Sequence, residues 1–333
     1  MSVENQGKLY LSSSPHFTSG SSTRNIMAAV LFALLPECVY GVILFGLPAL
    51  SVMLVSVASC FLFELLFQKV TRQKIVVSNL SPCVSGILLA LVLPSTVPVW
   101  MAVIGSFVAV VIAKGIFGGI GSNVFNPALT GRAFLFISFP AALGASWFNP
   151  EIDAVSSATA LSGIKAGTFA ADSSVYLQYF LGNRAGCIGE TSSLLILISF
   201  AFLVVIKVVD WRAPLAMVAA VAVCTFVSGG DVLLSLLTGG LLFGAAFMVT
   251  DYATAPVTGL GRIVFGFGCG LITFLIRKFG SYPEGVMFSI LIMNSVAPFL
   301  NNLTARMYGY GKKGNGCAMK KKAVSGISQE EAR

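Results

Sequence analysis

The amino-acid sequence predicts an all-α integral membrane protein with about ten transmembrane helices. Three observations support this fold class. Hydrophobic residues make up 56% of the 333 residues and charged residues only 10%, with a mean hydropathy of +0.89. Soluble domains carry about a quarter charged residues, so this chain lacks the charge needed to cover a water-facing surface. Long apolar runs also follow one another along most of the chain, and basic residues collect between them.

Each expected span is an apolar run of about 20 residues, the length needed to cross the hydrocarbon core of a bilayer. In the first half of the chain the runs fall at 25–46, 47–67, 78–96, 98–114 and 126–145. In the second half they fall at 191–208, 213–230, 232–250, 261–278 and 284–305. Five spans in each half would place the second half in inverted orientation, a construction that is common in transporters.

Two short stretches of the first half recur in the second and indicate two inverted five-helix repeats. The sequence Ser-Gly-Ile-Leu-Leu at 85–89 resembles Gly-Gly-Leu-Leu-Phe at 239–243. An Asn-x-x-x-Pro-x-Leu pattern at 123–129 occurs again at 294–300. The spacing differs between the copies, and chance similarity between apolar helices is the alternative interpretation.

Basic residues predict the orientation, because Lys and Arg concentrate in cytoplasmic loops. They cluster beside the spans at 69–74, 207–212 and 306–322, whereas Arg277 and Lys278 depart from this pattern. Both termini are therefore expected in the cytoplasm, and no cleavable signal peptide is visible. The expected organisation is a cytoplasmic N-terminal segment (1–24), a first membrane repeat (25–145), an external loop (146–190), a second membrane repeat (191–305) and a basic cytoplasmic tail (306–333).

Composition argues against several kinds of site. The net charge of +8 does not form a basic face with interleaved aromatic residues, so no binding of nucleic acid is expected. The seven cysteines include no CxxC pair and His16 is the single histidine, so we expect no metal site held by this chain alone. No catalytic side chain stands out either. The lysines of the tail are expected to contact anionic lipid or a partner protein.

A glycine-rich stretch at 114–123 interrupts the hydrophobic pattern between the fourth and fifth spans. Irregular backbone is tolerated at membrane depth only where it is buried in protein or lines a cavity. The stretch is therefore either a tight turn between packed helices or part of a ligand site. Four acids lie in or beside the spans, where each is a candidate for moving ions or a group near a helix end. They are Glu37, Glu64, Asp251 and Glu284.

The long external loop contains a run from Asp153 to Thr159 that is rich in Ser and Ala. From residue types alone, such a run after an aspartate is most often a helix cap or a turn. Its pattern, Asp-x-x-Ser-x-Ala-Thr, also resembles the flavinylation motif, in which a flavin transferase joins FMN through its phosphate to the threonine hydroxyl. The resemblance implies that Thr159 carries the FMN. Asp153, Ser156, Ser157 and Ala158 would complete the site: the small neighbours leave room for the donor, and the carboxylate positions it or orients the hydroxyl.

The surrounding chain resembles the family of the Rnf complex D subunit and, more distantly, of the B subunit of sodium-translocating NADH:quinone reductase. The stretches that carry the resemblance are 14–27, 114–127 and 251–261, within about 14–305. The quinone-reductase subunit usually has a longer N-terminal extension, which favours the Rnf side. The resemblance implies one membrane subunit of an ion-translocating ferredoxin:NAD oxidoreductase in the bacterial inner membrane. It would transfer electrons coupled to transport of Na⁺ or H⁺, without complete activity alone.

The resemblance also implies partners and a second cofactor. The partners are other Rnf subunits, which contain flavin and iron–sulfur clusters, and the flavin transferase during maturation. A non-covalent riboflavin among the helices is implied as well, without residues that could be named for it. The transferase is expected to act outside the cytoplasm, where the basic residues independently place Thr159. The alternative function is a solute channel or transporter with inverted repeats and no redox role, which would not need the run at 153–159.

Overall fold

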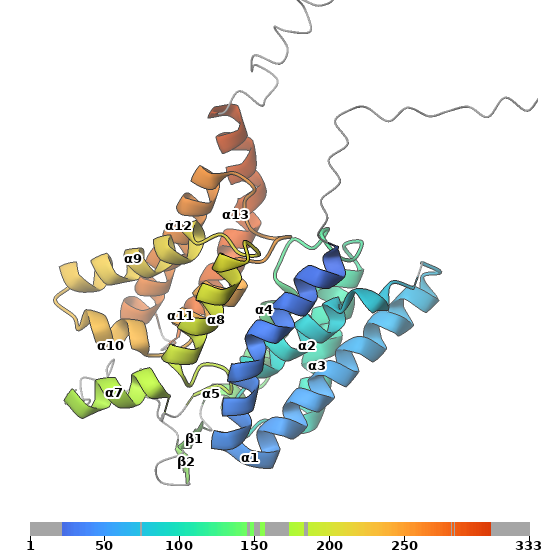
Figure 1. Ribbon diagram of the computed structural model, residues 1–333, viewed down its shortest axis with the longest axis horizontal. Coiled ribbons are helices and arrows are strands. Elements are labelled where there is room, and N and C mark those ends of the chain that lie inside the picture. Colours follow the sequence, from blue (N-terminus) through green and yellow to red (C-terminus); the bar gives the residue numbers. More distant parts are fainter. Residues whose placement is uncertain are drawn as a thin grey trace, which may run out of the picture.

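The structure, a computed structural model, describes residues 22–73, 75–144, 147–149, 154–156, 173–182, 186–280, 282 and 284–307. Helices make up almost all of this part of the chain (Figure 1). We refer to residues 22–144 as the first half and to residues 186–307 as the second half. A short hairpin and one helix lie between them in sequence.

The first helix, α1 (Thr23–Val70), contains 48 residues and folds back on itself. The reversal occurs at Gly46, whose φ of 68° and ψ of −151° are not helical, and Pro48 starts the second limb. Glycine adopts this positive φ without the steric cost that a side chain would bring. Figure 1 shows the two limbs as a V. The break agrees with the predicted boundary between the runs 25–46 and 47–67.

The other helices are shorter, and several are interrupted. The first half continues with a 3₁₀ turn η1 (Val77–Asn79), α2 (Ser81–Leu91), α3 (Val99–Phe107), its π-helical continuation η2 (Val108–Gly115), α4 (Pro127–Ser138) and α5 (Pro140–Gly144). Next come strands β1 (Trp147–Asn149) and β2 (Ala154–Ser156) and helix α7 (Ser173–Leu181). The second half contains α8 (Ser193–Val205), α9 (Arg212–Val227), α10 (Val232–Leu237), α11 (Leu241–Phe243), the π-helical η3 (Gly244–Met248), α12 (Gly259–Phe279) and α13 (Val286–Met307).

Three of the expected continuous spans are wrong in length. The run 78–96 forms only the 11 residues of α2. The run 126–145 breaks at Phe139, because the residue before a proline is disfavoured in the helical region. The run 232–250 breaks after Leu237, where Gly239 has a φ of 67°. Three helices are long and apolar enough to cross a membrane, namely α1, α12 and α13 over Val286–Thr304.

The distribution of apolar side chains identifies the solvent around the helices. The interior contains fully buried leucine, methionine and phenylalanine side chains, such as Leu89, Met217 and Phe265. The outer surface is also apolar: Ile43, Phe226 and many other large hydrophobic side chains are exposed. A soluble monomer rarely exposes contiguous apolar surface on this scale. Together with the long apolar helices, this surface shows that the chain is a membrane protein.

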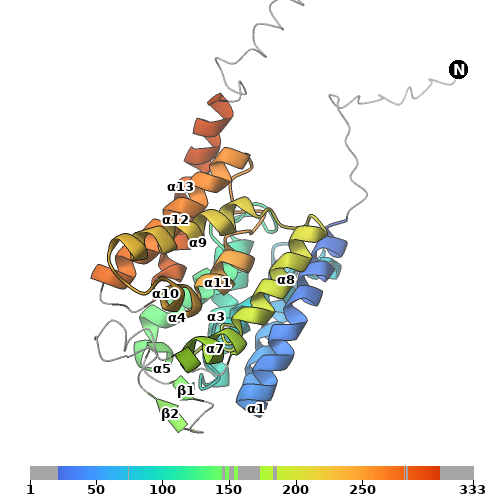
Figure 2. The same cartoon turned by 60° about the vertical axis from the view of Figure 1, so that its left-hand side comes forward.

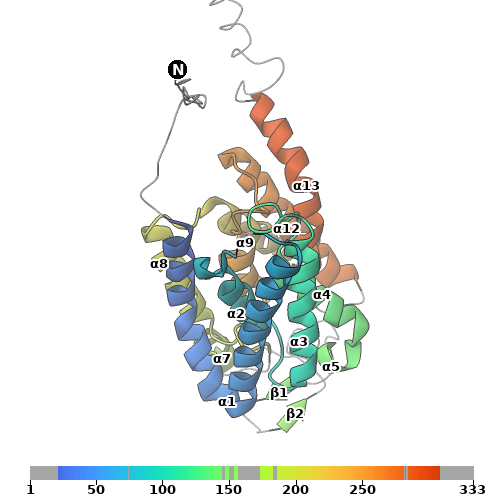
Figure 3. The same ribbon diagram turned by 90° about the vertical axis from the view of Figure 1, so that its right-hand side faces the viewer.

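The two ends of the helical body differ. Strands β1 and β2 pair antiparallel, with Trp147 opposite Ser156, and lie at the end where α1 reverses (Figures 1, 2 and 3). The start of α1 and the end of α13 lie at the other end in all three views. We call these the hairpin end and the terminal end. The end of α1 and the loop after α8, which contain Lys69 and Lys207, also lie towards the terminal end.

Candidate functional site

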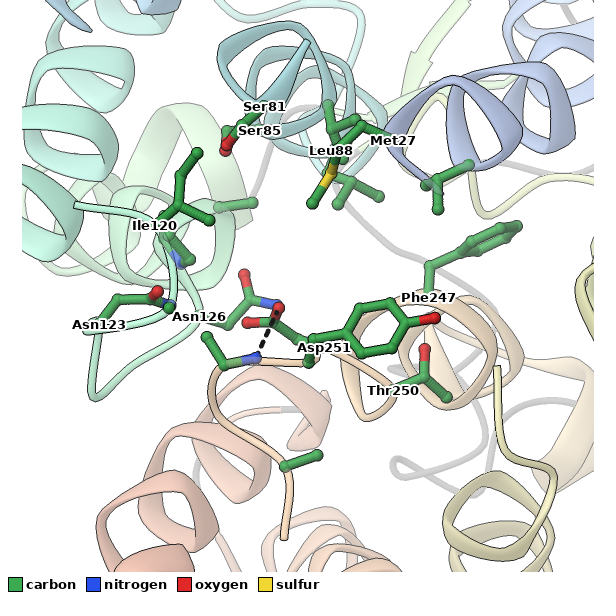
Figure 4. Close-up of a pocket in the computed structure, with 18 of the residues that line it drawn as sticks. Met27, Ser81, Ser85, Leu88, Ile120, Asn123, Asn126, Phe247, Thr250 and Asp251 are labelled. Atoms are coloured by element: carbon green, nitrogen blue, oxygen red, sulfur yellow. Dashed lines mark hydrogen bonds between the residues drawn. The ribbon is translucent and has the colours of Figure 1, made fainter. Parts of the chain in front are cut away.

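A cavity of about 390 Å³ opens between the two halves of the chain, on the side of the terminal end (Figure 4). This volume lies within the range of small-molecule binding sites. The first half contributes residues of α1, α2 and the segment that leads into α4, among them Met27, Val30, Ser81, Ser85, Leu88, Lys114, Asn123 and Asn126. The second half contributes Leu203, Phe247, Asn301 and the segment Thr250–Ala253. The wall is thus mostly apolar with a few polar groups, as is usual for sites that bind organic ligands.

Two helices begin at the cavity wall. Helix α2 starts at Ser81, after Leu80 in the left-handed conformation, and no side chain caps its first amides. Helix α4 starts at Asn126, whose side chain accepts a hydrogen bond from Leu129 N at 3.3 Å. The amide groups at a helix start carry partial positive charge. The cavity wall therefore favours ligand groups that are electron-rich, such as carbonyl oxygens or ring nitrogens.

The glycine-rich stretch at 114–123 forms part of this wall. Gly119 and Gly121 have φ values of 92° and 85°, and neither has a neighbour within 4 Å of the position that a Cβ would occupy. Backbone conformation, and not crowding, therefore selects glycine at both positions. Gly121 lines the cavity together with Asn123, whose amide donates to the carbonyl of Phe125. Of the two interpretations of this stretch, the structure supports a cavity wall.

Lys114 fixes one side of the cavity through a buried ion pair. Its Nζ lies 2.6 Å from Glu64 Oε2 and 2.7 Å from Ser81 Oγ, and the lysine is only 4% exposed. The three groups join the second limb of α1, the start of α2 and the end of η2. Burial of one charge without the other would be strongly unfavourable, so the pair holds these three elements together. Glu64 is therefore an ion-pair partner.

Asp251 is the acid on the opposite wall. It follows η3, and its carboxylate accepts a hydrogen bond from Thr254 Oγ1 at 3.1 Å. Burial raises the pKa of Asp251 above its ordinary value, while the bonds from Thr254 and Ala253 and the charge of Lys114 act in the opposite direction. In Figure 4 Asp251 and Asn126 lie close together at the cavity wall. The cavity thus places a carboxylate near the helix start that Asn126 caps.

A second charged cluster lies deeper in the body and joins the two halves. Arg132 of α4 bonds to Glu190 Oε1 at 3.3 Å and to Glu284 Oε2 at 2.8 Å. It also donates to the sulfur of Cys187 at 3.4 Å, and Glu284 Oε1 accepts from the backbone amide of Gly240 at 3.0 Å. Arg132 and Glu190 are buried. Glu284, a candidate for ion movement in the sequence, is thus part of an ion-pair network.

This network was missed at the level of sequence, although one signal for it exists. Arg132 is the single charged residue of the run 126–145. An arginine within an apolar run is costly unless it has a partner inside the protein. Its partners, however, are 58 and 152 residues away in the chain, so they become visible only in the structure.

The predicted flavin site falls largely outside the described residues. This applies to Asp153, Ser157, Ala158 and Thr159, about which the structure gives no information. Ser156 is described through its backbone, as the last residue of β2 opposite Trp147. The chain thus leaves the hairpin directly before the predicted attachment residue.

Comparison with known proteins extends over most of the chain. Residues 10–309 match the model of the NQR2, RnfD, RnfE family. The chain is 41% identical over 310 residues to the D subunit of the Na(+)-translocating ferredoxin:NAD(+) oxidoreductase complex of Acetobacterium woodii, covering 92% of this chain and 98% of that protein. It is 39% identical over 311 residues to the D subunit of the proton-translocating ferredoxin:NAD(+) oxidoreductase complex of Clostridium ljungdahlii, covering 88% of this chain and 94% of that protein. The D subunit of the ion-translocating oxidoreductase complex of Stutzerimonas stutzeri is 35% identical, covering 89% of this chain and 94% of that protein. The chain therefore belongs to the NQR2, RnfD, RnfE family.

Proposed function

We propose that this chain is the D subunit of an ion-translocating ferredoxin:NAD oxidoreductase complex. The observation that carries the proposal is its similarity, at 35–41% identity and nearly full length, to three proteins with that role in their names. A subunit of this kind works within a multi-subunit complex, so its partners are the other subunits of that complex. The alternative, a channel or transporter without a redox role, has no comparable support.

We further propose that FMN is attached through its phosphate to Thr159. The support is the motif from Asp153 to Thr159 together with its place directly after the β1–β2 hairpin. FMN would supply transfer of one or two electrons, and the protein supplies position and electrostatic surroundings. Attachment needs an accessible hydroxyl, which a segment at the hairpin end of the body offers to a flavin transferase.

The cavity between the halves is the proposed site of the non-covalent riboflavin. Its residues fit such a group: Met27, Leu88 and Phe247 offer apolar contact to a ring system, and Asn123 and Asn126 offer amide groups at the rim of a helix start. These side chains would orient the flavin and exclude water from its ring. The cavity volume of about 390 Å³ is of the size that organic ligands occupy.

The orientation proposed from the sequence places the terminal end of the body in the cytoplasm and the hairpin end outside. The structure removes one objection to this orientation. Arg277 is buried, and its guanidinium donates to the carbonyl oxygens of Ser235 at 2.7 Å and Thr238 at 3.2 Å. It therefore has a structural role at the end of α10 and does not count as a loop charge. The membrane is proposed to be the bacterial inner membrane.

The inverted five-helix repeat is also supported by a pair of equivalent contacts. The alignment of 85–89 with 239–243 places Ser81 opposite Ser235. Each serine begins or lies within a short, broken helix, and each receives a basic group from the fourth long element of its half. Lys114 donates to Ser81 and Arg277 donates to Ser235.

The proposed flavin attachment is tested by fluorescence of the denatured protein in a gel, after co-expression with the flavin transferase. We expect a fluorescent band, and a peptide containing Thr159 that is heavier by one FMN residue. Thr159→Ala should lose the fluorescence, whereas Thr168→Ala, a threonine of the same loop without the motif, should keep it. Fluorescence retained by denatured Thr159→Ala would contradict the assignment.

A further inference from the structure

Glu37 is a buried carboxyl group without a hydrogen-bond partner. It lies on the first limb of α1, directly after Pro36, and is 3% exposed. Neither Oε1 nor Oε2 has a hydrogen-bond partner, although both are inaccessible to solvent. An unpaired carboxylate in apolar surroundings is far more costly than a neutral carboxylic acid. Glu37 therefore differs from Glu64 and Glu284, each of which has a basic partner.

The group opposite Glu37 is the hydroxyl of Ser199 on α8. Ser199 is 2% exposed, and its Oγ has no hydrogen-bond partner in bonding geometry either. Two unsatisfied buried polar groups that face one another are unusual in native proteins and call for an explanation. A hydroxyl can donate to a carboxylate or accept from a carboxylic acid, so it suits both protonation states of Glu37.

Helix geometry connects this pair to the cavity. Met27, Val30, Leu34 and Glu37 follow one another at spacings of three and four residues, so they share one face of α1. Met27 and Val30 line the cavity, and Leu34 is fully buried between them and Glu37.

The matching face of α8 carries Leu203 at the cavity and Ser199 one turn further from it. Glu37 and Ser199 thus lie one helical turn beyond the apolar residues that close the cavity.

The other side of the pair leads towards the charged cluster of Arg132. Gly41, one turn after Glu37, packs against Ile188, since a Cβ on Gly41 would lie 2.6 Å from the Ile188 side chain. The neighbour of Ile188 in the chain, Cys187, contacts Arg132. The contact between α1 and α8 therefore runs from the cavity, past Glu37, to a network that contains two carboxylates.

We propose that Glu37 is a proton-binding site inside the membrane, which exchanges its proton along the contact between α1 and α8. Ser199 is the positioning residue that stabilises the ionised form. The titratable group that acts on Glu37 is the Cys38 thiol of the same helix. Among the described residues, no charged side chain of α8 or of the other helices packed on α1 is seen to act on it. Its part in ion movement rests on the proposed function, whereas its protonation does not.

The first test is chemical modification of the purified complex with dicyclohexylcarbodiimide, which reacts with neutral carboxyl groups in apolar surroundings. Mass analysis of the peptides should show labelling at Glu37 and about tenfold less at Glu64, whose carboxylate is paired with Lys114. Labelling of Glu37 should fall as pH rises and should not depend on Na⁺. A Glu37 peptide without label, while exposed sites react, would overturn the proposal. Protection by Na⁺ would overturn it too, because the site would then bind a metal cation.

Two variants separate proton binding from a structural role. Ser199→Ala should keep the label on Glu37 but extend labelling to higher pH, because the ionised form loses its hydroxyl. An unchanged pH profile would contradict the role of Ser199. Glu37→Gln preserves size and polarity, so the complex should assemble and transfer electrons while ion transport, measured as membrane potential in vesicles, falls about tenfold. Undiminished transport in Glu37→Gln would overturn its part in ion movement, and none of these results depends on whether Thr159 carries FMN.

Discussion

Arg132 and Glu284 form an ion pair of 2.8 Å between helix α4 and the segment that precedes α13. The pair joins residues of the two halves that are 152 positions apart in the sequence. Because Glu190 and the amide of Gly240 complete the network, it fixes the first half against the second at a point where several helices are broken.

Replacement of Arg132 by methionine should destabilise the protein severely. It would leave Glu190 and Glu284 without their cation, and loss of one partner of a buried ion pair costs about 3–5 kcal/mol. The measurement is the temperature at which the detergent-solubilised complex aggregates. Lys278→Met is the matched control, because Lys278 is an exposed basic residue of α12. Equal thermal stability of the two variants would contradict the structural role of the network.

Leucine at position 85 should exclude the proposed non-covalent flavin. Ser85 lines the cavity, so a larger side chain occupies ligand volume without removing a charge. Flavin released by acid precipitation should fall well below its wild-type amount, while covalent flavin in the pellet stays unchanged. The matched control is Ser295→Leu, since Ser295 is exposed on α13. Wild-type amounts of released flavin in Ser85→Leu would place that cofactor elsewhere.

Alanine at position 86 should separate α2 from α1. A Cβ on Gly86 would lie 2.7 Å from the Cα of Val57 and 3.0 Å from the carbonyl oxygen of Ser56, both of which belong to the backbone of α1. Overpacking of this kind costs about 1–3 kcal/mol. Gly186→Ala is the control, because open space surrounds the equivalent position there. The comparison is again thermal aggregation, and a stable Gly86→Ala protein would refute the close contact.

Asp210 should stabilise the protein in a pH-dependent way. Burial alone would raise its pKa, but hydrogen bonds from the Arg212 amide and the Arg262 guanidinium hold the pKa below its ordinary value. A lowered folded-state pKa stabilises the fold above the ordinary aspartate pKa, and this stabilisation is lost as pH falls through the lowered value. Asp210→Asn should therefore lower the thermal midpoint at neutral pH, by about 1 kcal/mol or less for this partly exposed pair.

The difference between wild type and Asp210→Asn should shrink towards about pH 3, where both carry little charge at this position. A double-mutant cycle with Arg262→Gln isolates the pair from the hydrogen bond of Arg212. A difference that grows on acidification would have the wrong sign for this mechanism.

Hydropathy predicted the location of the membrane-embedded elements and the reversal at Gly46. It could not predict that α2 is only 11 residues long or that the chain breaks around Thr238. Apolar composition reports affinity for lipid, whereas a helix break needs partners for the backbone groups that it frees. Those partners are distant in sequence: Arg277 donates to Thr238, and Glu284 accepts from Gly240.

The candidate site was predicted unevenly for a related reason. The glycine-rich stretch at 114–123 signalled a cavity wall because its residue types break the helical pattern. Lys114 and Glu64, however, are 50 residues apart, and no local pattern links them. For Thr159 the sequence motif carries the prediction, since that residue lies outside the described part of the chain.

The long separation between Arg132 and Glu284 also has a consequence for synthesis of the protein. Ribosomes add about 5–20 residues per second, so α4 is complete about 10–30 s before Glu284 has been made. During this interval the guanidinium lacks its 2.8 Å partner. The first half must then wait in the translocon, or under the protection of an insertase, until the last two helices arrive. Truncated chains that end before residue 284 should accordingly be substrates for membrane proteases, even though each of their apolar segments suits the bilayer.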